Sequence, residues 1–248
     1  MPPDNSPLFA SAEFAQFYDL ENRWAADFSF CTGLARAAAT VLDLGCGTGE
    51  LAVALSRTCD VTGVDPADAM LTLARARDTE RAVSWINADA RKLRLDRRLD
   101  LIVMTGHSFQ VFLSDADQHA VLKTIAAHLT QRGRFIFDMR NRDCRAWQGW
   151  RADKTRRRLS HPGLGQIEAW TEAEFDEASS VLAYTTTYRT RATGHSTATT
   201  AHIRFCTKDQ IALALQKAGL VAGRWLGDWR GSDWHPGSAE IIPLGRLK

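Results

Sequence analysis

An aspartate and three glycines stand at alternate positions near the start of the chain: Asp43, Gly45, Gly47 and Gly49. The apolar residues 41–44 predict a strand, and residues 50–57 predict a helix, so the glycines form the turn between them. Glycine has no Cβ, so such a turn lets the backbone approach a ligand closely. It also aims free N–H groups and the positive end of a helix at that ligand. The spacing therefore predicts a ligand-binding loop.

The loop does not fit either common phosphate-binding pattern. The dinucleotide fingerprint G-x-G-x-x-G needs a third glycine where this chain has Glu50, whose carboxylate would face a pyrophosphate. The Walker pattern is absent because no Lys-Ser/Thr pair follows the loop. A nicotinamide-dependent oxidoreductase is therefore disfavoured.

Three further polar residues follow later strands of the predicted sheet. Asp65 ends a β-branched run about twenty residues past the loop, Asp89 follows the strand that starts at residue 83, and His107 follows the apolar strand 99–104. Ligands of open α/β sheets bind at the carboxyl ends of the strands, where a carboxylate such as Asp65 can accept hydrogen bonds from ribose hydroxyls. His107 could act as a general base, because an unperturbed imidazole titrates near neutral pH.

The elements that position these residues alternate between strands and helices. Residues 41–138 predict the order β-α-β-α-β-β-α-β, which indicates an open, mostly parallel sheet. In this order, an amphipathic helix over residues 115–129 is expected to end at residues 131–133, and the fifth strand covers residues 134–138. Before the sheet, residues 8–39 carry aromatic residues at roughly helical spacing, with Ser11 as a cap and a second helix near residues 23–39. Such helices can fold over the carboxyl ends of the strands.

The pattern changes after residue 139. Residues 140–205 alternate without a helical period and predict an antiparallel meander of about three strands, which we interpret as an insert over the sheet edge. A helix resumes after Thr207, the expected N-cap, and stops at Gly219. Two strands follow, and Pro243 in the last one suggests an edge position.

Composition limits the class of protein. At 248 residues with 45% apolar residues, the chain is expected to form one domain, residues 1–248, with an insert. The formal net charge of +2 points to no particular partner, and no apolar stretch reaches the length of a membrane span. The start has no signal-peptide pattern, and the five cysteines are scattered without a C-x-x-C pair. We therefore expect a cytoplasmic protein without a disulfide framework or a metal site.

The glycine loop with Asp43, then Asp65, then Asp89, then the turn after the fourth strand, occur in the order found in class I S-adenosylmethionine-dependent methyltransferases. The chain resembles this family across roughly residues 8–140 and again across residues 205–248. The resemblance implies a Rossmann-like open sheet of about seven strands, the last one antiparallel, with helices on both faces. The expected parts are an N-terminal gate (8–39), a cofactor-binding core (41–139), a β insert acting as a lid (140–205) and a C-terminal part (206–248).

The resemblance also implies which residues bind S-adenosylmethionine and release S-adenosylhomocysteine as product. The methionyl and sulfonium part is expected against five residues: Asp43, Gly45, Cys46, Gly47 and Thr105. The stretch from Tyr18 to Trp24 is similar to the gate that closes over the carboxylate of the cofactor in small-molecule members of the family.

The adenosyl part is expected further along the core. The resemblance implies that Asp65 holds the ribose, that Met70 packs on the adenine, and that Asp89 and the Ala90 N–H bind the adenine edge. Each residue also has a structural interpretation: the acids could cap turns or helices, and Met70 could belong to the core.

The acceptor is less well defined by the sequence. The Asn/Asp-Pro-Pro-aromatic turn of DNA amino-methyltransferases and the Pro-Cys pair of cytosine-5 enzymes are both absent. Arginines and a lysine gather in residues 140–158, where they could bind a phosphate backbone, hold an anionic small substrate or form a solvated face. The aromatic residues of the insert and of the C-terminal part could line an acceptor pocket, form a homodimer contact or simply pack the lid.

We therefore predict methyl transfer to an O or N atom of a small molecule by direct displacement, with His107 as the candidate catalytic residue. A nucleic-acid partner and a membrane partner are not expected. One alternative is an RNA or protein methyltransferase that uses the arginine-rich insert. Another is a sensor that binds S-adenosylmethionine without transferring its methyl group.

Overall fold

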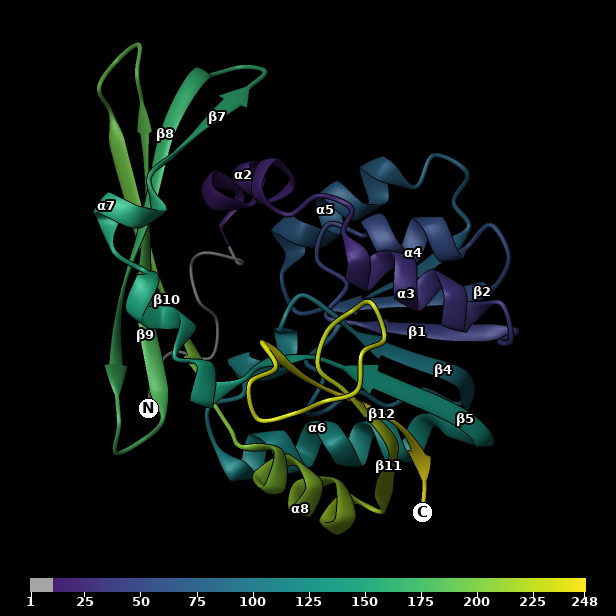
Figure 1. Cartoon of the computed structure of the whole chain (residues 1–248). Coiled ribbons are helices and arrows are strands. Elements are labelled where there is room, and N and C mark those ends of the chain that lie inside the picture. The colour runs from purple at the N-terminus through teal and green to yellow at the C-terminus, as the bar shows by residue number, and fades with distance from the viewer. Residues whose placement is uncertain (1–10) are drawn as a thin grey trace.

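The computed structural model describes residues 11–248 and contains a large central sheet, helices on both of its faces and a second, smaller sheet (Figure 1). The expected N-terminal tail and the first part of the expected gate, residues 8–10, lie outside the described residues. The amino-acid pattern explains both sheets, because apolar runs form the buried central strands and alternating runs form the half-exposed strands of the smaller sheet.

The central sheet has seven strands along its main path, in the order β11-β12-β5-β4-β1-β2-β3. Its strands are β1 (Thr40–Leu44), β2 (Asp60–Asp65), β3 (Val83–Asn87), β4 (Leu99–Met104), β5 (Leu129–Phe137), β11 (Leu220–Leu226) and β12 (Glu240–Leu247). Strands β1 to β5 pair in parallel, whereas β12 pairs antiparallel with both β5 and β11. The short strand β6 (Met139–Arg140) pairs with the start of β12. This arrangement confirms the predicted Rossmann-like sheet with its last strand antiparallel.

Helices cover both faces of this sheet. One face carries α3 (Ala26–Ala35), α4 (Glu50–Leu55) and α5 (Asp68–Arg77), and the other carries α6 (Asp115–His128) and α8 (Lys208–Ala218), as Figure 1 shows. Side chains alternate along each strand, so Val41 joins the apolar cluster under α3 and α4 while Leu42 joins the cluster over α6 and α8. The carboxyl ends of β1, β2, β4 and β5 lie side by side between these clusters. We call this side of the sheet its carboxyl edge, as distinct from the edge strands β11 and β3.

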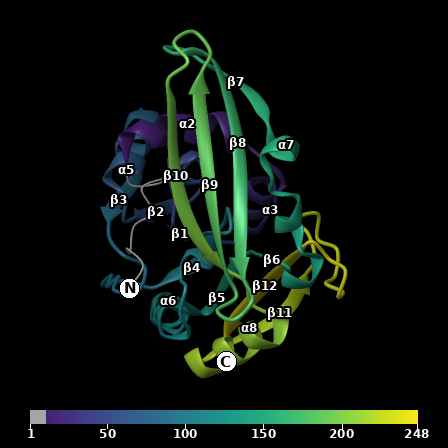
Figure 2. The ribbon, with the colours of Figure 1, turned by 90° about the vertical axis from the view of Figure 1, so that its left-hand side faces the viewer.

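The smaller sheet stands at that edge, with α2 (Ala12–Glu21) between it and the core (Figures 1 and 2). Its strands are β7 (Arg157–His161), β8 (Gly165–Asp176), β9 (Val181–Thr190) and β10 (Ser196–Arg204). Three short helices, η2 (Arg142–Cys144), η3 (Ala146–Gly149) and α7 (Ala152–Thr155), lead from β6 to β7. The meander has four strands, because the segment before β8 pairs with it as β7, rather than the three expected. We call this sheet the lid.

The prediction that the last strand lies at a sheet edge was wrong. Strand β12 lies between β11 and β5, and β11 forms the edge. Proline lacks an N–H, so an interior strand tolerates it only where no ladder bond is required. Pro243 falls between the pairing of β12 with β6, which covers Glu240 and Ile241, and its pairing with β5, which starts at Leu244.

The predicted end of the third core helix was also wrong. Helix α6 ends at His128, and residues 131–133 belong to β5 rather than to a helix terminus. A Cβ at Gly133 would lie 2.9 Å from the carbonyl oxygen of Leu99, at the irregularity in the pairing of β4 with β5. Gly133 is therefore explained by close contact between two strands. By contrast, Thr207 caps α8 in a capping box with Gln210, as predicted.

Candidate active site

The glycine loop connects β1 to α4 and adopts a conformation that favours glycine. Gly45, Gly47 and Gly49 have φ angles of 82°, 52° and 76°. The N–H of Gly45 donates to the carbonyl of Val64 at 2.8 Å, and the N–H of Gly47 donates to Oδ2 of Asp65 at 3.0 Å. The loop is thus tied to the end of β2 by its own backbone.

Asp65 is the side chain that organises this part of the site. Its Oδ1 accepts from the N–H of Ala67 at 2.9 Å, at the start of α5, while Oδ2 holds Gly47. Burial raises the pKa of Asp65, and the two backbone N–H groups partly offset that effect. Asp65 also lines the large cavity at this edge of the sheet. A carboxylate oxygen can accept more than one hydrogen bond, so Asp65 can bind a ligand hydroxyl while it holds the loop.

Neither Asp43, in β1, nor Cys46, in the loop, is among the residues that line the cavity. Asp43 is buried. Burial, and to a smaller extent repulsion from the charge of Asp65, raises the pKa of Asp43 to about 7. The sulfur of Cys46 faces strand β2, since it lies 3.3 Å from the position that a Cβ on Gly63 would occupy. These two residues can therefore influence a ligand through the loop and the local field, while the structure does not bring their side chains to the cavity.

The expected adenosyl residues Met70, Asp89 and Ala90 all line the cavity. Asp89 has a partner that the sequence analysis missed, because Arg91 donates to both of its carboxylate oxygens at 2.6–3.1 Å. Arg91 also reaches Asp117 on α6 at 2.9 Å. The arginine therefore fixes the orientation of Asp89, and a ligand must use the remaining acceptor capacity of that carboxylate.

Helix α2 brings Tyr18 to the glycine loop. A Cβ on Gly47 would lie 3.7 Å from the Tyr18 ring, and Tyr18 lines the cavity. Burial raises the pKa of Tyr18, so its hydroxyl stays protonated at neutral pH. The next residue, Asp19, anchors the helix: it accepts from Thr48 at 2.6 Å and pairs with Arg77 of α5.

The structure does not place Trp24, the other expected gate residue, at the cavity. Its side chain is 44% exposed, its Nε1–H donates to Ser29 at 2.9 Å, and its ring packs edge-on against Phe28. Helix α2 ends at Glu21, so Trp24 lies in the turn before α3, on the outside of the molecule.

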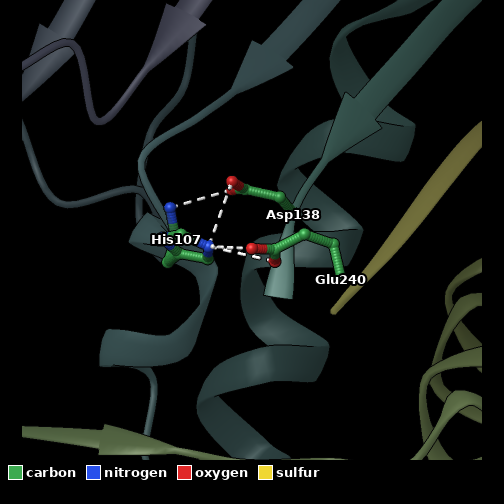
Figure 3. Close-up of side chains that lie close together, drawn as sticks. All are labelled: His107, Asp138 and Glu240. Atoms are coloured by element: carbon green, nitrogen blue, oxygen red, sulfur yellow. Dashed lines mark hydrogen bonds and ion pairs between the residues drawn. The ribbon is translucent and has the colours of Figure 1, made fainter. Parts of the chain in front are cut away.

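The turn after β4 presents Thr105 and His107 to the same cavity. His107 has a φ of 60°, which is uncommon for a residue with a side chain. Its backbone N–H donates to Oδ1 of Asp138 at 2.8 Å, and its Nε2 lies 3.0 Å and 3.1 Å from the two carboxylate oxygens of Glu240 (Figure 3). Oδ2 of Asp138 lies 3.6 Å from the same nitrogen. The two acids hold both the backbone and the ring of His107.

Asp138 and Glu240 were not predicted as site residues. Asp138 directly follows β5, so it occupies a strand end as Asp65 does, and that signal could have identified it. Glu240 begins β12, and the start of an antiparallel strand lies at the carboxyl edge of its parallel neighbours. Burial raises the pKa of Asp138, while the nearby His107 lowers it and the Nε1–H of Trp229 donates to it at 3.2 Å.

His107, Asp138 and Glu240 also form a set of potential metal ligands. Their donor atoms all lie within 4.8 Å of one another, and imidazole and carboxylate groups are common ligands of divalent cations. The expectation of no metal at this site therefore stays a prediction that requires a direct test.

One cavity of about 1320 Å³ joins the loop, His107 and the lid. On the lid side it is lined by Arg140, Trp150, Tyr184, Thr186, Tyr188 and His202. A single small-ligand site usually measures about 300–1000 Å³, so this space can hold two ligands side by side. Helix α2 forms another wall of the cavity and contacts the lid. The Phe17 ring stacks on Tyr188 at 4.2 Å, and both carboxylate oxygens of Glu21 accept from Arg157 at 2.6–2.7 Å.

The sequence comparisons agree with this geometry. Residues 41–133 match the model of a family described as a methyltransferase domain. The chain is 33% identical over 100 residues to a cypemycin N-terminal methyltransferase from Streptomyces, covering 40% of this chain and 41% of that protein. It is 34% identical over 100 residues to a malonyl-[acyl-carrier protein] O-methyltransferase from Priestia megaterium, covering 39% and 35%. These matches therefore span about two fifths or less of the length of either relative.

Solved structures resemble nearly the whole chain. An S-adenosylmethionine-dependent methyltransferase from Clostridium acetobutylicum superposes with a TM-score of 0.77 at 18% identity, covering 95% of this chain and 98% of that one. The sugar N-methyltransferase KedS8 from Streptoalloteichus gives a TM-score of 0.73 at 20% identity, covering 94% and 91%. At such identities the likeness establishes the fold, lid included.

Residues 41–133 therefore match a methyltransferase domain, and the chain has the fold of solved S-adenosylmethionine-dependent methyltransferases. The resemblance inferred from the glycine loop and the strand-end acids is thereby confirmed.

Proposed function

We propose that this protein transfers the methyl group of S-adenosylmethionine to an N or O atom of a small molecule held between His107 and the lid. The observation that carries this proposal is that one cavity is lined both by the glycine loop with Asp65 and by the lid. The similarity to an N-methyltransferase, an O-methyltransferase and a sugar N-methyltransferase supports the two acceptor atoms and the small substrate.

The residues around the loop fit the cofactor. Asp65 offers a carboxylate to ribose hydroxyls, Met70 offers a soft thioether to a ring face, and Asp89 offers acceptor oxygens to an amino group. Tyr18 covers the loop from α2. Gly45, Gly47, Ala90 and Thr105 contribute backbone at the cavity wall. When bound, S-adenosylmethionine supplies a methyl group already activated by a sulfonium, so the protein needs mainly to position an acceptor.

His107 is suited to remove the proton of the acceptor. In the neutral ring, a proton on Nε2 donates to Glu240, which leaves Nδ1 as the basic nitrogen. The described residues provide no hydrogen-bond partner for Nδ1. Glu240 and Asp138 fix the ring and stabilise the imidazolium that forms when the acceptor loses its proton.

The arginine-rich segment gives little support to an RNA or protein acceptor. Four of its basic side chains form ion pairs with acidic neighbours: Arg142, Arg151, Arg156 and Arg157. Neutralised side chains contribute less to binding a polyanion. Ready elution from heparin at low salt would support the small-molecule proposal, and retention at moderate salt would favour the alternative.

The cofactor assignment can be tested with Asp65→Ala. Thermal unfolding is measured with and without S-adenosylhomocysteine; at about 100 times Kd the ligand should stabilise the wild type by roughly 2.7 kcal/mol, which is about 5–10 °C. Asp65→Ala should unfold cooperatively but lose this shift. Asp60→Ala is the matched control, because Asp60 lies exposed at the opposite end of the same strand and should keep the shift. An unchanged shift in Asp65→Ala would show that the assignment is wrong.

A second measurement separates an enzyme from a sensor. The enzyme should form S-adenosylhomocysteine in the presence of a panel of small amines, alcohols and phenols, whereas a sensor would bind the cofactor without forming product. Loss of turnover in His107→Ala with retained cofactor binding would support the role of His107 as base.

The remaining expectations stay predictions. We infer a cytoplasmic location from the cysteines, all five of which are unpaired. Among the described residues, no helix is long and apolar enough to cross a membrane. A homodimer formed through the lid is a further prediction, which the mass of the protein in solution would test.

A further inference from the structure

Arg140 is a charged residue of the cavity wall that the proposed methyl transfer does not use. It belongs to β6, where it pairs in register with Glu240 of β12, and its side chain lines the cavity on the lid side of His107. Because directly opposite residues on paired strands point to the same face, Arg140 and Glu240 lie on the same face of this strand pair.

Arg140 has no acidic partner within ion-pair distance among the described residues. The carboxylate of Glu240 turns to His107, and Asp138 binds the backbone of His107 and the Trp229 ring nitrogen. The other two arginines that line the cavity differ in this respect, since Arg91 pairs with two aspartates and Arg157 pairs with Glu21. A buried cation is normally paired, so an unpaired guanidinium in a cavity wall points to a missing anion.

The surroundings hold the guanidinium in place. Gln110, which is fully buried, accepts hydrogen bonds from both the backbone N–H of Arg140 (3.2 Å) and its Nη1 (3.3 Å). The amide of Gln110 is itself fixed, because its Nε2 donates to the carbonyl of Arg204 at 3.0 Å. The ring of Trp150 lies 5.2 Å from the guanidinium carbon. Of the five N–H donors of this side chain, the hydrogen bonds among the described residues use one, on Nη1.

Tyr184 adds a neutral donor to the same region. Its ring packs edge-on against Trp150 at 5.6 Å, and it lines the cavity beside Arg140. Burial raises the pKa of Tyr184 to about 12, although the nearby Arg140 lowers it, so its hydroxyl remains protonated at neutral pH. A cation, a hydroxyl and an aromatic face thus converge on one part of the cavity.

We propose that Arg140 binds an anionic group of the acceptor, a carboxylate or a phosphate, and so orients the acceptor with its nucleophilic atom toward His107. This inference rests on the proposed methyl transfer and names the class of acceptor. A guanidinium binds either anion through two parallel N–H bonds, which fixes direction as well as position. The adjacent Trp150 and Tyr184 favour an acceptor with an aromatic or other flat apolar part.

The opposite explanation is that Arg140 only balances the negative charge of Glu240 and Asp138. In that case Arg140 and the two acids would nearly cancel in charge, and an anion would gain little from binding beside them. Binding of simple anions distinguishes the two explanations, because a charge already balanced gains little from a further anion.

The test uses benzoate and inorganic phosphate as probes, titrated calorimetrically into the full-length protein saturated with S-adenosylhomocysteine. Benzoate, phosphate or both should bind the wild type, and Arg140→Gln should bind the same probe at least tenfold more weakly. Benzamide, the neutral analogue of benzoate, should bind both proteins equally. Arg140→Lys should fall between them, because an ammonium cannot form the two-bond contact. Which probe binds distinguishes a carboxylate from a phosphate acceptor.

Arg142→Gln is the matched control, since Arg142 lies two residues along the chain but pairs with Glu177. It should bind the probes as the wild type does. Equal affinity in Arg140→Gln, or no binding of either anion by the wild type, would overturn the proposal. Cofactor binding is measured in the same samples, so its loss would count against the methyltransferase function separately. The titrations are repeated without S-adenosylhomocysteine, which keeps the anion test valid in that case.

Discussion

Replacement of Asp43 by Asn should stabilise the protein at neutral and alkaline pH. An aspartate in an unfolded chain has a pKa of about 3.9, whereas burial and repulsion from Asp65 raise the pKa of Asp43 to about 7 in the folded state. The folded state therefore binds a proton more tightly than the unfolded state does. The contribution of Asp43 to stability is fully present below about pH 4 and is lost as the pH rises toward 7.

The size of the effect follows from the two pKa values. A difference of roughly three pKa units corresponds to about 4 kcal/mol at pH 8. Asn keeps the shape and one acceptor oxygen, but its amide N–H needs a partner in a buried place. We therefore expect a net gain of about 1–3 kcal/mol at pH 8 and no gain, or a small loss, at pH 4.5.

Urea unfolding of wild type and Asp43→Asn at pH 4.5, 6 and 8 checks this, with the difference between the two proteins as the measured quantity. Asp100→Asn is the control, because the pKa of Asp100 is shifted in the opposite direction to that of Asp43. Partial burial raises the pKa of Asp100, but hydrogen bonds from Thr40 and Ala39 outweigh it and lower the pKa overall. Its substitution should therefore destabilise most above pH 4. The argument from burial fails if the difference in unfolding free energy between Asp43→Asn and the wild type is the same at every pH. Asp43 would then be charged in the folded protein.

Three further predictions concern the site. His107→Ala should lower kcat about 100-fold and Glu240→Gln about tenfold, both with unchanged affinity for S-adenosylhomocysteine; equal kcat in all three proteins would reduce these residues to structural roles. Tyr18→Ala should weaken that affinity about tenfold, whereas Trp24→Ala, on the outer surface, should change it less than twofold, as calorimetry can measure. Methyl transfer should survive dialysis against EDTA; loss that Mg²⁺ or Mn²⁺ restores would assign a metal to His107 and its two acids.

The sequence alone determined the class of the fold and most of the strand-end residues that we propose bind the cofactor. The glycine loop, Asp65 and Asp89 stand at fixed places relative to their own strands, so local patterns were enough to predict that they meet. The apolar runs of the core strands likewise predicted a mostly parallel sheet, because strands buried on both faces have a distinct composition.

Only the tertiary structure decided how the surroundings of His107, the proposed catalytic residue, are assembled. Glu240 lies 133 residues after His107, and no local pattern shows that the antiparallel β12 inserts between β11 and β5 and brings its first residue to His107. The same insertion places Arg140 opposite Glu240 while Glu240 turns to His107. Strand order depends on packing between distant segments, whereas a turn or a cap depends on neighbouring residues. For that reason Pro243 and Gly133 were misinterpreted and Thr207 was not.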